Sequence, residues 1–164
     1  MKIKLKKTMF VALAFASSLA YSSAFAQTKL RYAHVGVANA PQTIYADEVA
    51  KLVKERTSGR IEIQVFPNSQ LGGVGEMVDG IKAGAIAIGH HDFASLGKIL
   101  PATAVFNTPF VYRDPEHSLR ATDSRNSKAL QEINKQLVDK GGMRIVGSFF
   151  QGTRQLTSKE KVLS

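Results

Sequence analysis

The 164-residue sequence predicts an α/β fold in which a mainly parallel sheet is flanked by helices on both faces. Segments of strand and helix character alternate through the first half of the chain with short connections, and this order favours parallel pairing. Hydrophobic residues make up 44% of the chain, enough for a core at the length of one domain. The absence of cysteine excludes a disulfide framework, a thiolate nucleophile and a cysteine-based zinc site.

The first 26 residues have the features of a secretory signal peptide. Four lysines among the first seven residues precede the apolar run Met9–Ala20, and Ala24-Phe25-Ala26 is a small-residue cleavage site. The apolar run is short for a membrane anchor, so we expect cleavage after Ala26. The mature protein would then be periplasmic and would span residues 27–164.

The charge of the chain bears on the kind of partner it binds. The net charge of +9 falls to +5 for residues 27–164, because the leader contains four lysines and no acidic residue. The remaining basic residues are spread along the chain, without a basic stripe interleaved with aromatic residues. We therefore expect no nucleic-acid partner, whereas a mildly positive body suits a small anion.

A strand over Leu30–His34 and a helix after it begin the predicted fold. Pro41 is a favourable first helical residue, and Ser58-Gly59 is expected to end the helix. The inward face of this helix is expected to contain residues at helical spacing, namely Tyr45, Val49, Leu52, Val53 and Arg56.

A second strand, a second helix and a third strand are expected to follow. Apolar and polar residues alternate over Arg60–Phe66, which is the pattern of a strand. From Val74 to Ile81 apolar residues recur with helical spacing, and Gly84 is expected to end that amphipathic helix. Ala85–Gly89 is then a short apolar strand.

The C-terminal half predicts two helices and one further strand. We interpret Pro101–Val111 as a buried connecting segment. Asp114 is expected to cap a helix that begins at Pro115, and a longer helix runs from about Ser127 to Lys140. The stretch from Met143 to Phe150 is predicted to be a strand buried on both faces. Its apolar residues occupy both odd and even positions, which point to opposite faces of a strand. The inward residues of the longer helix are expected to be Leu130, Ile133, Leu137 and Val138.

Arg154 directly follows the last predicted strand. Ligands of open α/β sheets bind beyond the carboxyl ends of the strands. A guanidinium group at that position is a planar, permanently charged donor suited to a carboxylate. The alternative for this arginine is a structural ion pair or a solvated charge.

The four histidines, His34, His90, His91 and His117, raise the question of a metal site. Adjacent residues of a strand point to opposite faces, so His90 and His91 cannot easily share one ion, and we predict neither a metal nor another cofactor. No serine lies in a nucleophile elbow, so an enzyme is the less favoured class of protein. Turnover of a candidate acid would distinguish an enzyme from a binding protein.

Five segments outside the leader carry a family resemblance. They are Leu30–His34, Glu55–Ile63, Phe66–Gly72, Val105–Phe110 and Gly152–Thr157. The P-N-S-Q-L-G and G-T-R-Q-L-T sequences among them are specific in combination. Together the segments resemble the solute-binding proteins of TRAP (tripartite ATP-independent periplasmic) transporters over essentially the whole chain.

The resemblance implies a periplasmic-binding-protein-like fold of two lobes, also called a venus flytrap. Such a protein captures a small organic acid by its carboxylate and delivers it to the membrane permease subunits of the transporter. The resemblance further implies a protein that is not an enzyme and that is a monomer when complete.

The resemblance also implies which residues contact the ligand. Arg154 matches the arginine that contacts the ligand carboxylate in the family. The other residues expected to line the cleft lie near strand ends or beside Arg154, and they are His34, Val35, His91, Asp92, Phe93 and Gln151.

The sequence departs from the family pattern at its C-terminal end. Family members continue into a second lobe, which contains a further arginine in a segment of G-L-K-x-R type. We therefore interpret residues 27–164 as an N-terminal lobe with the start of the crossover, its second lobe largely missing through truncation or a frameshift. A non-functional fragment of such a protein is the alternative, and the downstream nucleotide sequence would distinguish the two.

Overall fold

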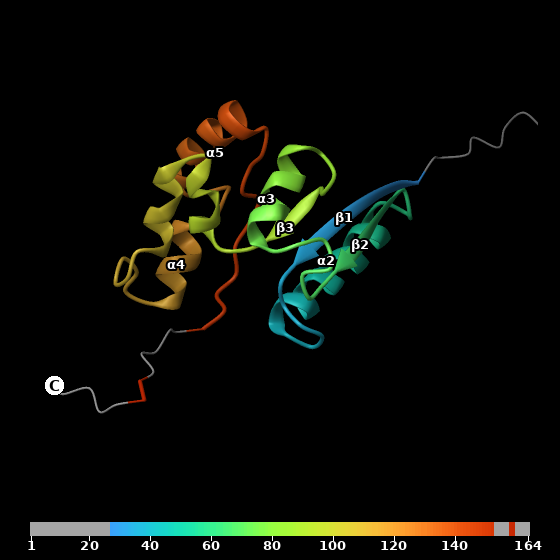
Figure 1. Cartoon of the computed structure of the whole chain (residues 1–164), viewed down its shortest axis with the longest axis horizontal. Coiled ribbons are helices and arrows are strands. Elements are labelled where there is room, and N and C mark those ends of the chain that lie inside the picture. The colour runs from blue at the N-terminus through green and yellow to red at the C-terminus, as the bar shows by residue number, and fades with distance from the viewer. Residues whose placement is uncertain (1–26, 153–157, 160–164) are drawn as a thin grey trace, which may run out of the picture.

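The structure, a computed structural model that describes residues 27–152 and 158–159, contains a three-stranded parallel sheet (Figure 1). Its strands, in the spatial order β2-β1-β3, are β1 (Thr28–His34), β2 (Ile61–Phe66) and β3 (Ile88–His90). Helix α2 (Pro41–Arg56) connects β1 to β2, and helix α3 (Val74–Lys82) connects β2 to β3. The predicted alternation of strands and helices with parallel pairing is confirmed.

The two connecting helices cover opposite faces of the sheet. Tyr32 of β1 packs with Ala46 of α2, whereas Ala33 packs with Met77 of α3. Neighbouring residues of a strand point to opposite faces, so β1 contributes to both apolar layers. The predicted arrangement of a sheet flanked on both faces is therefore confirmed.

The inward face of α2 differs from the prediction. Ala46 is fully buried, whereas Tyr45 is 43% exposed and Arg56 is exposed. Tyr45 and Arg56 therefore lie outside the buried layer, although Val49 and Val53 belong to it as expected. A small side chain at the point of contact allows the helix to approach the sheet closely, and hydrophobic spacing alone does not identify that point.

Four helical segments form a second layer of the structure, beside α3 (Figure 1). They are the 3₁₀ helices η2 (Phe93–Lys98) and η3 (Pro101–Asn107) and the α-helices α4 (Pro115–Ala121) and α5 (Lys128–Gly141). Their core contains Leu96, Phe106, Leu130 and Leu137, and Val78 of α3 belongs to it. Helix α3 thus packs against the sheet on one side and against this helical core on the other.

The predicted starts of α4 and α5 are confirmed by their N-caps. The Asp114 carboxylate accepts a hydrogen bond from the His117 amide at 2.6 Å, and the Ser127 hydroxyl accepts one from the Leu130 amide at 3.2 Å. Such bonds satisfy amide groups that have no partner inside the helix.

The prediction of buried residues is wrong in two segments. Within Pro101–Val111, Phe106 is buried, but Phe110 is fully exposed and Val111 is 40% exposed. A 3₁₀ helix has three residues per turn, so Thr103 and Phe106 of η3 lie on the same, buried side. The chain leaves the core after this helix. On α5, Val138 is 45% exposed, because it lies about 100° around the helix from the buried Leu137.

The strand predicted from Met143 to Phe150 is also wrong, because this segment is irregular. Val146 is 71% exposed and Phe150 is 41% exposed, so the segment is not buried on both faces. Backbone groups of this segment form hydrogen bonds with side chains, whereas those of a strand would bond to the backbone of a neighbouring strand. The Ser124 hydroxyl, for example, donates to the Val146 carbonyl at 2.8 Å.

The described part of the chain contains no helix that is long and apolar enough to cross a membrane. Residues 1–26, where the signal peptide is predicted, lie outside the described residues, so that cleavage stays a prediction.

Candidate functional site

His34 and His90 occupy equivalent positions at the carboxyl ends of adjacent strands. They are the last residues of β1 and β3 and are partners in the parallel register. Their ring centroids lie 6.3 Å apart. The register thus places two imidazoles at the edge of the sheet where ligands bind in open α/β folds.

Three further aromatic rings surround this pair. The resulting edge cluster consists of Tyr32, His34, Tyr45, His90 and Phe149. Phe149 packs edge-on against His90, with ring centroids 4.8 Å apart, and it stacks on Tyr45 at 5.4 Å. The cluster therefore joins β1, β3, α2 and the irregular segment after α5.

Tyr32 orients the His90 ring. The Tyr32 hydroxyl and Nδ1 of His90 form a hydrogen bond of 3.2 Å. Tyr32 is only 4% exposed, and its burial, followed by the effect of Tyr45, raises its pKa well above the usual range. Tyr32 is therefore a neutral phenol that fixes one nitrogen of His90.

Both histidines of the edge cluster are held in the neutral form. Burial, with smaller effects of His34 and His91, lowers the pKa of His90 to about 4. Burial also lowers the pKa of His34, although the Asp47 carboxylate partly opposes this effect. Near neutral pH the sheet edge therefore contains two uncharged imidazoles.

His34 has an unusual environment. It is fully buried, and neither ring nitrogen has a hydrogen-bond partner among the residues that the structure describes. Buried polar atoms are nearly always paired, so each exception calls for a physical explanation. A Cβ atom at Gly36 would lie 3.2 Å from Nδ1 of His34, so the backbone after β1 closely covers this ring.

Two of the predicted cleft residues lie at the surface. Val35 directly follows β1 and is 40% exposed. Gln151 is exposed just beyond Phe149 and Phe150. Ligand contact by either residue stays a prediction.

The three predicted residues after β3 have local partners. His91 is half-buried, and its Nδ1 lies 3.0 Å from the Asp92 carbonyl. The Asp92 carboxylate caps η2 by accepting from the amide of Ser95 at 2.9 Å and from its hydroxyl at 2.7 Å. Phe93 packs on Phe106 at 5.0 Å and contributes to the helical core. These contacts give Asp92 and Phe93 structural roles, while ligand contact stays a prediction for all three residues.

Arg154, the predicted carboxylate-binding residue, lies outside the described residues, so its role also stays a prediction.

Sequence reasoning missed four members of the edge cluster as site residues: Tyr32, Tyr45, His90 and Phe149. Tyr32 could have been found, because it stands two residues before His34 on one strand and therefore shares its face. Pairing of the predicted strands could likewise have placed His90 beside His34. The approach of Tyr45 and Phe149 depends on the packing of α2 and of the segment after α5.

The described residues contain no group of three or more histidine, cysteine, aspartate or glutamate side chains placed to hold a metal ion. The edge cluster itself brings together only two histidines.

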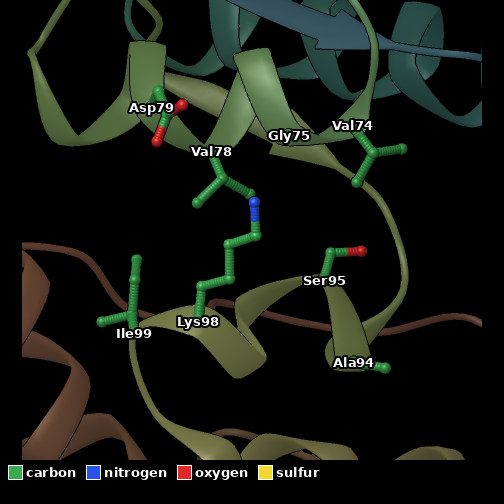
Figure 2. Close-up of a pocket in the computed structure, with 8 residues that line it drawn as sticks. All are labelled: Val74, Gly75, Val78, Asp79, Ala94, Ser95, Lys98 and Ile99. Atoms are coloured by element: carbon green, nitrogen blue, oxygen red, sulfur yellow. The ribbon is translucent and has the colours of Figure 1, made fainter.

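A separate pocket of about 310 Å³ lies between α3 and η2, and Figure 2 shows its lining residues. Apolar side chains such as Val74, Val78 and Ile99 form much of its wall, and Asp79 and Lys98 contribute opposite charges. Helix α3 covers the face of the sheet opposite to the one that α2 covers. This pocket is therefore distinct from the edge cluster.

Comparisons with known proteins agree with the architecture. The chain is 28% identical over 160 residues to the 2,3-diketo-L-gulonate-binding periplasmic protein YiaO of Escherichia coli K12, covering 95% of this chain and 46% of that protein. Among solved structures, it is similar to a TRAP periplasmic solute-binding protein from Sulfurospirillum deleyianum with bound succinate, at 33% identity and a TM-score of 0.62. That match covers 71% of this chain and 36% of the other.

A TRAP periplasmic solute-binding protein from Polaromonas sp. JS666 bound to D-erythronate is similar at 26% identity and a TM-score of 0.62, over 70% of this chain and 37% of that one. The chain therefore spans less than half the length of these relatives. The family model DctP, described as bacterial extracellular solute-binding protein, family 7, matches residues 32–164. With this match over most of its length and the parallel sheet that it shares with the solved structures, the chain belongs to the DctP family of solute-binding proteins.

Proposed function

We propose that the chain forms the N-terminal lobe of the extracytoplasmic solute-binding component of a TRAP transporter. In this proposal it captures a small organic carboxylate and delivers it to the membrane permease subunits. The membership of the DctP family and the ligands named for the relatives, which include succinate and D-erythronate, support this proposal.

The observation that carries the proposal is the position of the edge cluster. It lies at the carboxyl ends of two parallel strands and combines aromatic rings with a few polar atoms, as small-molecule sites commonly do. We propose that Arg154 supplies the positive charge that pairs with the ligand carboxylate beside this cluster. Val35, His91 and Gln151 are proposed to complete the surface around the ligand.

We further propose that the protein binds its ligand without transforming it. Tyr32 is held as a neutral phenol and His90 as a neutral imidazole, so their hydrogen-bonded pair does not contain an activated nucleophile. The family match, which is to solute-binding proteins, supports the same conclusion.

The proposed place of action is the periplasm. The leader sequence, with its lysines, its apolar run and the cleavage site that ends at Ala26, supports export followed by removal of residues 1–26. A carboxylate captured in this compartment would be available to a permease in the inner membrane.

Titration calorimetry on the full-length protein encoded by the gene tests the proposal. The panel should contain dicarboxylates, sugar acids and aromatic acids, with uncharged sugars as the control. We expect saturable 1:1 binding of at least one carboxylate and no chemical change of the ligand in a parallel NMR assay. A folded protein that binds no carboxylate, or that turns one over, would contradict the proposal.

A further inference from the structure

Resting on the proposed function, we propose that the edge cluster selects a carboxylate whose remaining carbons carry hydroxyl groups, such as a sugar acid, over a dicarboxylate. His90 is proposed to hydrogen bond a ligand hydroxyl, and Tyr32 is proposed to position His90 for this contact. The inference concerns the part of the ligand that contacts the edge cluster.

The geometry of His90 supports a role in binding. Its Nδ1 is engaged by the Tyr32 hydroxyl at 3.2 Å, whereas Nε2 has no hydrogen-bond partner among the described residues. The ring is half-buried, and Tyr45 and Phe149 pack against it edge-on. The His90 ring is thus held on several sides and retains one nitrogen for a further partner.

The charges around His90 disfavour a second carboxylate. With a pKa of about 4, only about one His90 ring in a thousand is protonated at pH 7. The ionisable groups facing the two histidines are Tyr32 on β1, Tyr45 and Asp47 on α2, and His91 after β3. Among these groups Asp47 is the carboxylate, and it acts on His34.

A second carboxylate of the ligand would therefore meet the neutral His90 ring in place of a cation. A partly desolvated anion without a positively charged partner is strongly disfavoured.

A hydroxyl group matches the neutral His90 ring better than a carboxylate does. A neutral imidazole has one donor and one acceptor nitrogen, and a hydroxyl can serve as the complement of either. Tyr45, which is 43% exposed, adds apolar surface suited to the carbon chain or ring of a sugar acid.

The experiment compares affinities of the full-length chain for D-erythronate, D-glucuronate and succinate by titration calorimetry. We expect at least one of the two hydroxy acids to bind roughly tenfold or more tightly than succinate, because a site built for a hydroxyl rejects an analogue without it. Equal or tighter binding of succinate would overturn this inference and leave the proposed function intact. If no carboxylate binds, both are overturned.

Tyr32→Phe removes the hydroxyl and retains the ring. We expect it to reduce the preference for the hydroxy acid by roughly threefold or more, since it removes one neutral hydrogen bond that orients His90. The matched control is Tyr112→Phe, because the Tyr112 hydroxyl donates to the Phe106 carbonyl at 3.0 Å, outside the edge cluster. An unchanged preference in folded Tyr32→Phe would overturn the positioning role.

A second readout separates positioning from general stabilisation. The ¹⁵N shifts of His90 report the fraction of each tautomer, and Tyr32→Phe should change that fraction while Tyr112→Phe should not. His90→Gln, which keeps neutral hydrogen-bonding groups, should retain more of the preference than His90→Phe. Equal preferences in these two variants would overturn the assignment of His90, whether or not Tyr32→Phe folds.

Discussion

Asn134 and Ile145 are joined by a pair of hydrogen bonds. The side-chain nitrogen of Asn134 donates to the Ile145 carbonyl at 2.9 Å, and its side-chain oxygen accepts from the Ile145 amide at 2.8 Å. One buried side chain on α5 thus satisfies both backbone groups of Ile145, as a neighbouring strand would. This pairing fixes the start of the irregular segment that brings Phe149 to the edge cluster.

Replacing Asn134 by alanine should destabilise the fold. We expect a loss of about 2 kcal/mol in the free energy of unfolding, because both backbone groups of Ile145 lose their partner in a partly buried site. Urea denaturation of the full-length chain measures this loss. Lys135→Ala is the control, since its exposed pair with Glu132 at 3.5 Å should contribute less than about 0.5 kcal/mol. Equal effects of the two substitutions would contradict the prediction.

Stability should fall as the pH is lowered from about 6.5 to 4. The folded-state pKa of His90 is about 4, whereas its ordinary value is 6.5. In this window the unfolded chain binds a proton that folded His90 does not, so acidification favours unfolding. The contribution of His90 is on the order of 2 kcal/mol, present above pH 6.5 and lost progressively toward pH 4. The lowered pKa of His34 acts in the same direction.

Urea denaturation between pH 4 and 8, with NMR titration of the His90 ring protons, measures this effect. His90→Gln should flatten the dependence, because its side chain does not titrate. Titration of folded His90 near pH 6.5 would show that this histidine is not held neutral by its surroundings.

Two substitutions of Asp92 separate a capping role from a ligand-binding role. Asp92→Ala should lower the free energy of unfolding by about 1 kcal/mol, because the amide and hydroxyl of Ser95 lose their acceptor. Asp92→Asn should retain most of the stability, since asparagine is also a good N-cap. Neither change should weaken carboxylate binding if Asp92 only caps η2. A loss of affinity in folded Asp92→Asn would instead assign its charge to the ligand site.

Arg154→Ala should reduce carboxylate affinity about thirtyfold or more. This follows from a loss of about 2 kcal/mol when one partner of a desolvated charge pair is removed. Arg154→Lys should recover only part of the affinity, because lysine keeps the charge but loses the planar pair of donors. Arg125→Ala is the control, since the Arg125 side chain is 86% exposed and its partner Asp123 is local. Calorimetry showing unchanged affinity in folded Arg154→Ala would return Arg154 to a structural or solvated role.

The mature chain should begin at Gln27. We expect the intact mass of periplasmic material to lack residues 1–26, because the leader ends in a small-residue cleavage site. Mass spectrometry of periplasmic and membrane fractions tests this expectation. A full-length mass retained in the membrane fraction would contradict the predicted cleavage.

Local patterns in the sequence were sufficient for much of the fold. The alternation of Ile61, Ile63 and Val65 predicted the face of β2 that packs under α2, since every second residue of a strand points to the same side. Asp114 predicted the start of α4, because an N-cap depends on amides within the next few residues. Helical spacing predicted that α5 begins near Ser127.

The candidate site depended on contacts between distant segments. The sequence placed His34 and His90 at strand ends, but the β1–β3 register is what brings the two residues next to each other. Tyr45 and Phe149, separated by about a hundred residues, meet there only after α2 and the segment beyond α5 have packed. The apolar stretch from Met143 to Phe150 has strand-forming residues, but a strand requires a neighbour, and Asn134 bonds to the Ile145 backbone instead.

By itself, the sequence determined the order of the three strands and of the helices between them, the two-sided cover of the sheet and the N-cap of α4. These features depend on local periodicity and on short-range hydrogen bonds. The tertiary structure decided which rings surround His90, which residues of α2 are buried and where the segment after α5 runs. These features depend on non-local packing, because each apolar side chain and each backbone group must find its partner in the assembled fold.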